Sequence, residues 1–359
     1  MSSHPYAALT PDIILDAVET YGLRATGALH ALNSYENRVY RIDIEEDAQG
    51  RANVAGGTTP RMEEVEQRRE QLPRTPGATK VAAKFYRPER WSDAAIREEH
   101  AFALELAATE IPVVAPLARA DGETLFTHAG FRFALFPWQP GRVSELNTRE
   151  ERLVLGRYLG RLHRVGRARR FQHRPALTVE TFGRDSAQFV LAQDFLPGYL
   201  RDSYQALTDQ LLDRIAAVFD AILPPTLRLH GDCHLSNLLW TDGAPHLVDL
   251  DDCRMGPAVQ DLWMLLSGSH ADMEMQVGQV LEGYSQFMEF DPAELALLEP
   301  LRTLRLMHYA AWLARRWDDP AFPINFPWFN SPRYWEEHLQ NLREQLAALD
   351  EPTLSWRPD

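Results

Sequence analysis

The stretch RLHGDCHLSNLLWTDGAPHLVDLDD, from Arg228 to Asp252, constrains this chain more than any other part of it. It gathers five aspartates, three histidines, a cysteine and an asparagine in one short segment. Such crowding is not a solvated charge run, so the segment predicts a reactive site. Two kinds of site fit these residues: a hydrolytic metal centre on His230 and His234, or a phosphoryl-transfer loop that uses the carboxylates and Asn237.

The hydrolytic alternative needs two histidines one helical turn apart with a glutamate between them. His230 and His234 have this spacing. However, Gly231 is a poor helix residue, no glutamate lies between the histidines, and residues 226–229 favour an extended entry. A zinc hydrolase is therefore disfavoured.

Phosphoryl transfer needs a carboxylate that accepts the attacking hydroxyl's proton, and an amide oxygen and a second carboxylate on magnesium. Asp232 is followed five positions later by Asn237, the interval of the kinase catalytic loop. Two short strands are predicted over residues 238–240 and 246–250, and the turn between them returns Asp249 towards Asn237. Hard oxygen ligands of this kind suit Mg²⁺ better than zinc.

The chain has 359 residues, which is too long for one compact core of ordinary size, so two lobes are expected. Residues 1–137 predict a small antiparallel sheet with one main helix, and residues 138–359 predict a larger, mainly helical lobe. This pattern indicates an α+β fold. Residues 45–79 carry almost no large apolar side chain and predict a flexible insertion. The strands of the first lobe are predicted over residues 27–44, 80–86, 113–118 and 124–136.

Composition excludes several classes of partner. The net charge of −14 would repel a phosphate backbone, so nucleic acid is not an expected partner. No apolar run reaches the roughly 18 residues of a membrane-spanning helix, and the first residues lack the pattern of a signal peptide, so a cytoplasmic protein is expected. Cys233 and Cys253, the two cysteines of the chain, cannot form a disulfide framework and are expected to be reduced.

Lys84, in the first predicted lobe, is one of two lysines in the chain. Of the 37 basic residues only Lys80 and Lys84 are lysine, so the chain uses arginine wherever a generic positive charge suffices. A compact ammonium group differs from a guanidinium fork, and Lys84 is predicted to hold the nucleotide phosphates. Glu99 lies at helical spacing from Ile96 and Phe102, on the apolar face of its helix, and a carboxylate that faces inward needs a partner. Lys84 is the expected cation.

The predicted phosphate loop differs from that of protein kinases, because residues 27–44 contain no G-x-G-x-x-G motif. The tip of this hairpin carries Ser34 instead. Its hydroxyl and the neighbouring amides either donate to the β- and γ-phosphates or only form the turn.

The segment H-G-D-x-H-x-x-N followed by V-D-L-D-D resembles the catalytic core of the aminoglycoside phosphotransferase and choline kinase superfamily, which has the two-lobed protein kinase fold. Six segments across residues 32–328 together resemble a narrower family, the bacterial stress response kinase A family of serine/threonine protein kinases. They are LNSYENRVY, AKFYRPERW, LRLHGDCHLSNLLW, VDLDD, GPAVQDLWMLL and DPAFPINFPW.

The resemblance implies a role for each candidate residue. Asp232 corresponds to the catalytic base, and Asn237 and Asp249 to the magnesium ligands, with Asp249 counted among the catalytic residues as well. Ser34 corresponds to a contact with ATP. Asp261 resembles a structural aspartate beneath the catalytic loop. The roles of Asp251 and Asp252 stay open between assistance to the metal and capping of a turn.

The expected function is that of an ATP- and Mg²⁺-dependent serine/threonine protein kinase in a bacterial stress response, monomeric and able to phosphorylate itself. One alternative keeps the fold and changes the acceptor to a small molecule such as an amino alcohol, an aminoglycoside or a sugar. Another is a non-catalytic nucleotide-binding scaffold, which is disfavoured because the base, both metal ligands and the lysine are all present. His163 is predicted to be a hydrogen-bonded core histidine, and Cys233 either a buried filler or an oxidant-sensitive thiol.

Overall fold

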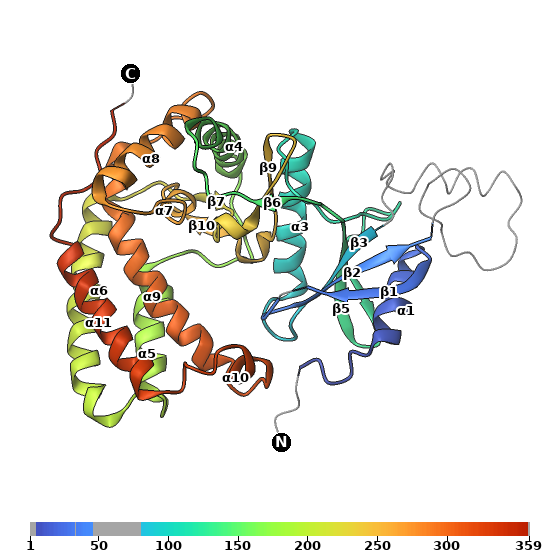
Figure 1. Cartoon of the computed structure of the whole chain (residues 1–359), viewed down its shortest axis with the longest axis horizontal. Helices are drawn as coiled ribbons and strands as arrows, with labels where there is room; N and C mark the ends of the chain where they lie inside the picture. The colour runs from blue at the N-terminus through green and yellow to red at the C-terminus, as the bar shows by residue number, and fades with distance from the viewer. Residues whose placement is uncertain (1–4, 33, 46–79, 358–359) are drawn as a thin grey trace, which may run out of the picture. The chain divides into compact units, whose positions relative to one another are not determined.

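The computed structural model describes residues 5–32, 34–45 and 80–357 (Figure 1). The predicted insertion therefore lies outside the described residues from position 46 onwards. The chain divides into two compact units: the first comprises Met1–Gly141 and His246–Asp251, and the second comprises Arg142–Pro245 and Asp252–Asp359. The predicted boundary at residues 137 and 138 lies close to Gly141, but the short segment that carries Asp249 joins the first unit.

The first unit is built on one five-stranded antiparallel sheet with the strand order β1-β2-β3-β5-β4. The strands are β1 (Ala25–Ala31), β2 (Arg38–Ile44), β3 (Lys80–Phe85), β4 (Phe126–His128) and β5 (Phe131–Pro137). β3 lies at the centre, where Lys84 is paired with Val39 of β2 and with Ala134 of β5. The predicted strand over residues 113–118 does not form; Val113 makes only an isolated bridge to Leu247.

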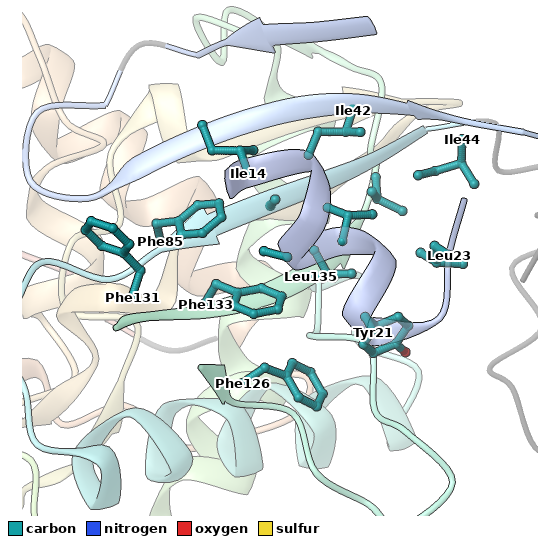
Figure 2. Close-up of a cluster of buried hydrophobic side chains, with 14 of the residues drawn as sticks. Ile14, Tyr21, Leu23, Ile42, Ile44, Phe85, Phe126, Phe131, Phe133 and Leu135 are labelled. Atoms are coloured by element: carbon teal, nitrogen blue, oxygen red, sulfur yellow. The ribbon is translucent and has the colours of Figure 1, made fainter. Parts of the chain in front are cut away.

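The two faces of this sheet are covered by different helices, α1 (Pro11–Tyr21) and α3 (Asp93–Ala108). Side chains alternate along a strand, so Phe133 and Leu135 pack with Ile14 of α1 in the core shown in Figure 2. Ala134 points the other way and packs with Ile96 of α3. Burial of each large side chain contributes about 1.5–3 kcal/mol, so this core holds the central strand in place.

α3 begins at Asp93, directly after its N-cap Ser92. The side chain of Ser92 accepts a hydrogen bond from the backbone N–H of Ala95 at 3.2 Å, as an N-cap does. The helix then buries Glu99 together with its apolar face.

Two backbone hydrogen bonds attach the segment 246–251 to the first unit. Val114 N–H donates to the Leu247 carbonyl at 3.0 Å, and Leu247 N–H donates to the Pro112 carbonyl at 2.7 Å. These bonds bring the residues before Asp249 into the first unit.

The second unit is mainly helical. Its helices are α4 (Arg149–Arg167), α5 (Asp185–Ala192), α6 (Arg201–Ile222), α7 (Gln260–Trp263), α8 (His270–Tyr284), α9 (Leu298–Arg315), α10 (Ala321–Asn325) and α11 (Pro332–Ala348). Short π and 3-10 turns are η1 (Val179–Arg184), η2 (Gly198–Leu200), η3 (Leu235–Asn237), η4 (Leu250–Asp252) and η5 (Pro292–Leu297). α4 and α8 pack so closely at Gly160 that a β-carbon there would collide with the Tyr284 carbonyl group. None of the helices described is long and apolar enough to cross a membrane.

Short strands frame the segment from Arg228 to Asp252. β7 (Leu227–Leu229) pairs with β10 (Arg254–Gly256), and β6 (Arg142–Val143) pairs with β8 (Leu238–Thr241). The turn after β8 has positive φ at Asp242 and Gly243, as a two-residue hairpin turn requires. β9 (Ala244–Leu247) then ends three residues earlier than the predicted strand, because Asp249 has a left-handed φ of 60° and a 3-10 turn begins at Leu250.

Candidate active site

Lys84 is the centre of the charged cluster in the first unit. Its side chain is buried, and its Nζ lies 3.4 Å from Glu99 Oε1, 3.1 Å from Asp249 Oδ1 and 3.1 Å from Asp251 Oδ1. Burial on its own would lower the pKa of Lys84, but Asp249, Asp251 and Glu99 outweigh it and hold the pKa well above its usual range. The predicted pair of Lys84 and Glu99 is therefore in contact, and the lysine carries its charge at neutral pH.

The carboxylates of Asp249 and Asp251 differ in their exposure to solvent and in their contacts. Asp251 is 3% exposed, and its two oxygens lie on Lys84 and on Arg90. The side chain of Asp249 is 56% exposed and meets Lys84 through Oδ1. Asp249 has a left-handed φ of 60°. Such a conformation costs energy on a residue other than glycine and is often found at functional sites. Asp249 thus has a carboxylate open to solvent, and its role as a metal ligand stays a prediction, whereas Asp251 is a buried partner of Lys84 and Arg90.

Arg90 continues this cluster towards the tip between β1 and β2. Its Nε lies 3.6 Å from Glu36 Oε1, and Arg87 lies 3.8 Å from the same oxygen. The side chains of Arg90 and Glu36 are 9% and 12% exposed. We call Lys84, Asp251, Arg90 and Glu36 the charge network of the first unit. Sequence reasoning missed Arg90, because nothing in its immediate neighbourhood separates it from the many other arginines.

Ser34 lies at the predicted tip, where its hydroxyl donates to the Asn37 carbonyl at 2.8 Å. The Asn37 side chain in turn accepts from the backbone N–H of Arg87 at 3.0 Å. The hydroxyl of Ser34 thus stabilises the turn through this hydrogen bond, and its contact with ATP stays a prediction.

The loop of the second unit that contains Asp232 is held from below by Asp261, as predicted. The fully buried Asp261 carboxylate accepts from the N–H groups of His230 and Gly231, each at 2.8 Å. His163 lies 3.0 Å from the same carboxylate and 2.9 Å from the Tyr284 hydroxyl, which confirms its role as a hydrogen-bonded core histidine. Gly231 has a φ of +85°, and a β-carbon there would collide with the Asp252 carbonyl group. The loop conformation therefore depends on this glycine.

The Asp232 carboxylate lies beside His234 and Arg305 of its own unit. Its Oδ2 lies 3.4 Å from His234 Nε2, and its Oδ1 lies 2.8 Å from Arg305 Nη1. Burial would raise the pKa of Asp232, but the hydrogen bond from His234 and the charge of Arg305 lower it below its ordinary value. Asp232 is therefore ionised at neutral pH and can accept a proton. Arg305, which comes from α9, was not found by sequence reasoning because it lies far from the loop along the chain.

Asn237 closes the loop. Its side-chain N–H donates to the Asp232 carbonyl at 3.0 Å, which leaves the amide oxygen as its other polar atom. An amide oxygen and the exposed Asp249 carboxylate are hard ligands, so both residues fit Mg²⁺ by their chemistry. They belong to different units, and their sharing of one ion stays a prediction.

His230 and His234 contact Asp232 within its loop. His230 is fully buried, and its Nδ1 lies 3.4 Å from the Asp232 N–H. Within the described ranges, no three His, Cys, Asp or Glu side chains form a group that could hold a metal ion. This finding gives the zinc alternative no support. A magnesium site made of one asparagine, one aspartate and nucleotide phosphates would not appear as a group of three such side chains.

Both cysteines are buried free thiols, as expected. Burial, together with the charges of Asp261 and Asp232, raises the pKa of Cys233 well above its ordinary value. A thiol of this kind reacts slowly with oxidants, so the structure favours Cys233 as a packing residue over a redox sensor.

Comparison with known proteins adds to this geometry. The sequence model of the phosphotransferase enzyme family matches residues 59–298. Stress response kinase A of Escherichia coli (strain K12) is 42% identical over 357 residues, which cover 99% of this chain and 98% of that protein. A protein of Salmonella typhimurium (strain LT2) named serine/threonine protein kinase RdoA is 42% identical over 353 residues, with 98% and 97% covered.

A solved structure shows the fold. Amicoumacin kinase hAmiN, solved in complex with AMP-PNP, Ca²⁺ and Ami, is similar over 93% of this chain and 92% of that chain, with a TM-score of 0.62 and 17% sequence identity. The predicted α+β, kinase-like fold is thereby confirmed.

Proposed function

Because this chain belongs to the phosphotransferase enzyme family, and within it to the group of the stress response kinase A proteins, we propose that it is an ATP- and Mg²⁺-dependent kinase that phosphorylates serine or threonine hydroxyls of proteins. The observation that carries the proposal is the buried Lys84, charged and held by Glu99 and Asp249. A buried ammonium group among carboxylates fits the cation that kinases place on nucleotide phosphates.

Each site residue has a part in the proposed reaction. The acceptor hydroxyl attacks the γ-phosphorus, its proton passes to the Asp232 carboxylate, and the bond between the γ-phosphorus and the bridging oxygen breaks to release ADP. Arg305 and His234 keep Asp232 ionised, and Asp261 holds the backbone of its loop. Asn237 and Asp249 would hold Mg²⁺, which, when bound, neutralises charge on the phosphates. Ser34 would donate to the phosphates from the tip between β1 and β2.

The acceptor class is proposed from the name of the Salmonella relative, which is that of a serine/threonine protein kinase. The test incubates the protein with labelled ATP and Mg²⁺ in the presence of either a generic basic protein or a panel of amino alcohols, aminoglycosides and sugars. Transfer to protein serine or threonine, and to the enzyme itself, supports the proposal. Efficient transfer to a metabolite with none to protein would overturn the acceptor class and leave the phosphotransferase in place.

A further inference from the structure

The segment DPAFPINFPW, which ends at Trp328, has no part in the nucleotide chemistry above. In the second unit it forms α10 and the turn after it, and both pack on α9 (Figure 1). The ring of Trp312 in α9 lies 5.1 Å from that of Phe322 and 6.0 Å from that of Phe326. Phe326 continues the contact to Trp328 at 5.9 Å. The segment therefore builds an aromatic surface on α9.

Several of these side chains face solvent. Tyr309 stacks on Trp312 at 5.7 Å and is 38% exposed, and Trp328 is 42% exposed. Ile324 of α10 is 76% exposed. We call Tyr309, Trp312, Phe326 and Trp328 the aromatic stripe. Tyr309 and Trp328 are exposed at the two ends of the stripe, Trp312 is half-buried and Phe326 is buried between them. Exposed aromatic side chains on such a base often mark interaction surfaces.

The aromatic stripe is continuous with the candidate base. Arg305, whose guanidinium lies 2.8 Å from Asp232, is one helical turn before Tyr309 and two turns before Trp312 on the same face of α9. At 1.5 Å per residue the separation along the helix axis is about 6 Å to Tyr309 and about 10 Å to Trp312. A small metabolite that places its hydroxyl at Asp232 would not reach the stripe, whereas an extended peptide covers such a distance in roughly two to three residues.

Charge further narrows the chemistry of the occupant. Arg305 precedes the stripe with a side chain that is 39% exposed, and the guanidinium of Arg316 lies 5.1 Å from the Trp312 ring. Arg305 and Arg316 place positive charge along the stripe, in a chain whose net charge is −14. Such a face is complementary to a carboxylate that lies between the reacting hydroxyl and an apolar anchor.

We propose that the aromatic stripe docks the acceptor protein of the proposed kinase: an extended segment that presents an aromatic or large aliphatic side chain about two to three residues from the phosphorylated serine or threonine, with an acidic residue between them. This inference rests on the proposed function. It gives the enzyme a sequence preference that a metabolite kinase does not have.

The experiment uses the full chain and synthetic peptides with one central serine. In one set a tryptophan is moved residue by residue, up to about six positions to either side, to cover the reach estimated above. In a second set the residue between the serine and the tryptophan is glutamate, alanine or lysine. Transfer from labelled ATP is measured as kcat/KM, and binding of the same peptides with alanine in place of serine is followed by fluorescence anisotropy.

Wild-type enzyme is expected to prefer tryptophan at one position within this window by about tenfold, and glutamate over lysine beside it. The double variant Tyr309→Ala/Trp328→Ala loses the tryptophan preference and the matching gain in binding, whereas Tyr309→Phe/Trp328→Phe retains both. The control is Met275→Ala, which truncates a side chain that is 45% exposed on α8. α8 lies at the upper end of the second unit in Figure 1 and α10 at its lower end.

The outcomes separate the two proposals. Transfer to peptides with no positional preference, or a preference that the double alanine variant keeps, overturns docking on the stripe and leaves the protein kinase in place. Transfer to metabolites alone, with no peptide bound, overturns both. Loss of the preference in the Met275→Ala control as well also counts against the stripe, because the effect would then not be local to it.

Discussion

Lys84 shows how the surroundings of one side chain decide its role. Lys84 is 6% exposed, and its ammonium group lies within 3.4 Å of three carboxylates, so the lysine and the carboxylates stabilise each other's charged forms. Removal of one partner of a buried ion pair leaves uncompensated charge and is strongly destabilising.

Lys84→Ala is therefore expected to lower the free energy of unfolding by about 3–5 kcal/mol, because Glu99 and Asp251 would both lose the buried ammonium group that they contact. Urea unfolding followed by circular dichroism measures the change. Lys80→Ala, the matched control on the same strand, should change the unfolding free energy by less than about 0.5 kcal/mol. Equal losses for the two variants would contradict the central place of Lys84.

Arg305 has its effect through the pKa of Asp232. Its charge lowers that pKa, so Arg305→Ala should raise it. A general base acts only when ionised, and kcat/KM falls as the pH drops through its pKa. The acid limb of the pH profile should therefore move to higher pH in Arg305→Ala. Arg302→Ala, which breaks a pair with Glu299 elsewhere on α9, is the control, and identical profiles for both variants would refute the role of Arg305.

At the scale of elements, the charge network of the first unit joins parts that are far apart along the chain. Arg90 contacts Asp251, which follows β9, and Glu36, which lies between β1 and β2. The tip that carries Ser34 is thus tied to the lysine that is proposed to bind the same nucleotide.

Arg90→Ala should loosen this tip and raise the KM for ATP by about tenfold, with a smaller change in kcat, because binding geometry rather than proton transfer is affected. Steady-state kinetics with varied ATP resolve the two constants. Arg97→Ala removes an exposed pair with Glu123 and serves as the control. A KM for ATP that stays at the wild-type value in Arg90→Ala would show that the network does not position the nucleotide.

Glu294 links η5 to the start of α7 and makes stability depend on pH. Its buried carboxylate accepts from the Val259 N–H at 3.0 Å, and burial raises its pKa to about 7. The folded state then binds the proton more tightly than the unfolded state, so this group favours folding at low pH and loses that contribution as the pH rises from its ordinary pKa of 4.5 towards 7.

Glu294→Gln keeps the acceptor and removes the titration. Relative to this variant, the unfolding free energy of the wild type should fall across that pH range, as measured by denaturant titrations at several pH values. Parallel pH dependences for the two proteins would contradict the raised pKa.

At the scale of the whole molecule, the sequence predicts what depends on local pattern. The α+β fold, the strand that carries Lys84 and the helix that buries Glu99 follow from periodicity and spacing. The membership of the stress response kinase A group follows from the resemblance of six segments to that family. The fold and the family are confirmed. Glu99 was correctly paired with Lys84 because a carboxylate on an apolar face requires a cation.

Other features depend on contacts that no local pattern encodes. Arg305 and Arg90 each reach an aspartate far away in the sequence, and in a chain rich in arginine neither stands out. The predicted strand up to residue 250 ends early because Asp249 adopts a left-handed conformation, which strand periodicity does not reveal. Such tertiary preferences override local propensity.

The central claim is that Asp232 accepts the proton of the acceptor hydroxyl in a transfer that uses ATP and Mg²⁺. It is tested most directly by the rate of transfer from labelled ATP in the wild type and in Asp232→Asn, with nucleotide affinity measured alongside by calorimetry. We predict that Asp232→Asn binds nucleotide as the wild type does but transfers phosphate about 10²- to 10⁴-fold more slowly. Transfer by Asp232→Asn at the wild-type rate would contradict this account.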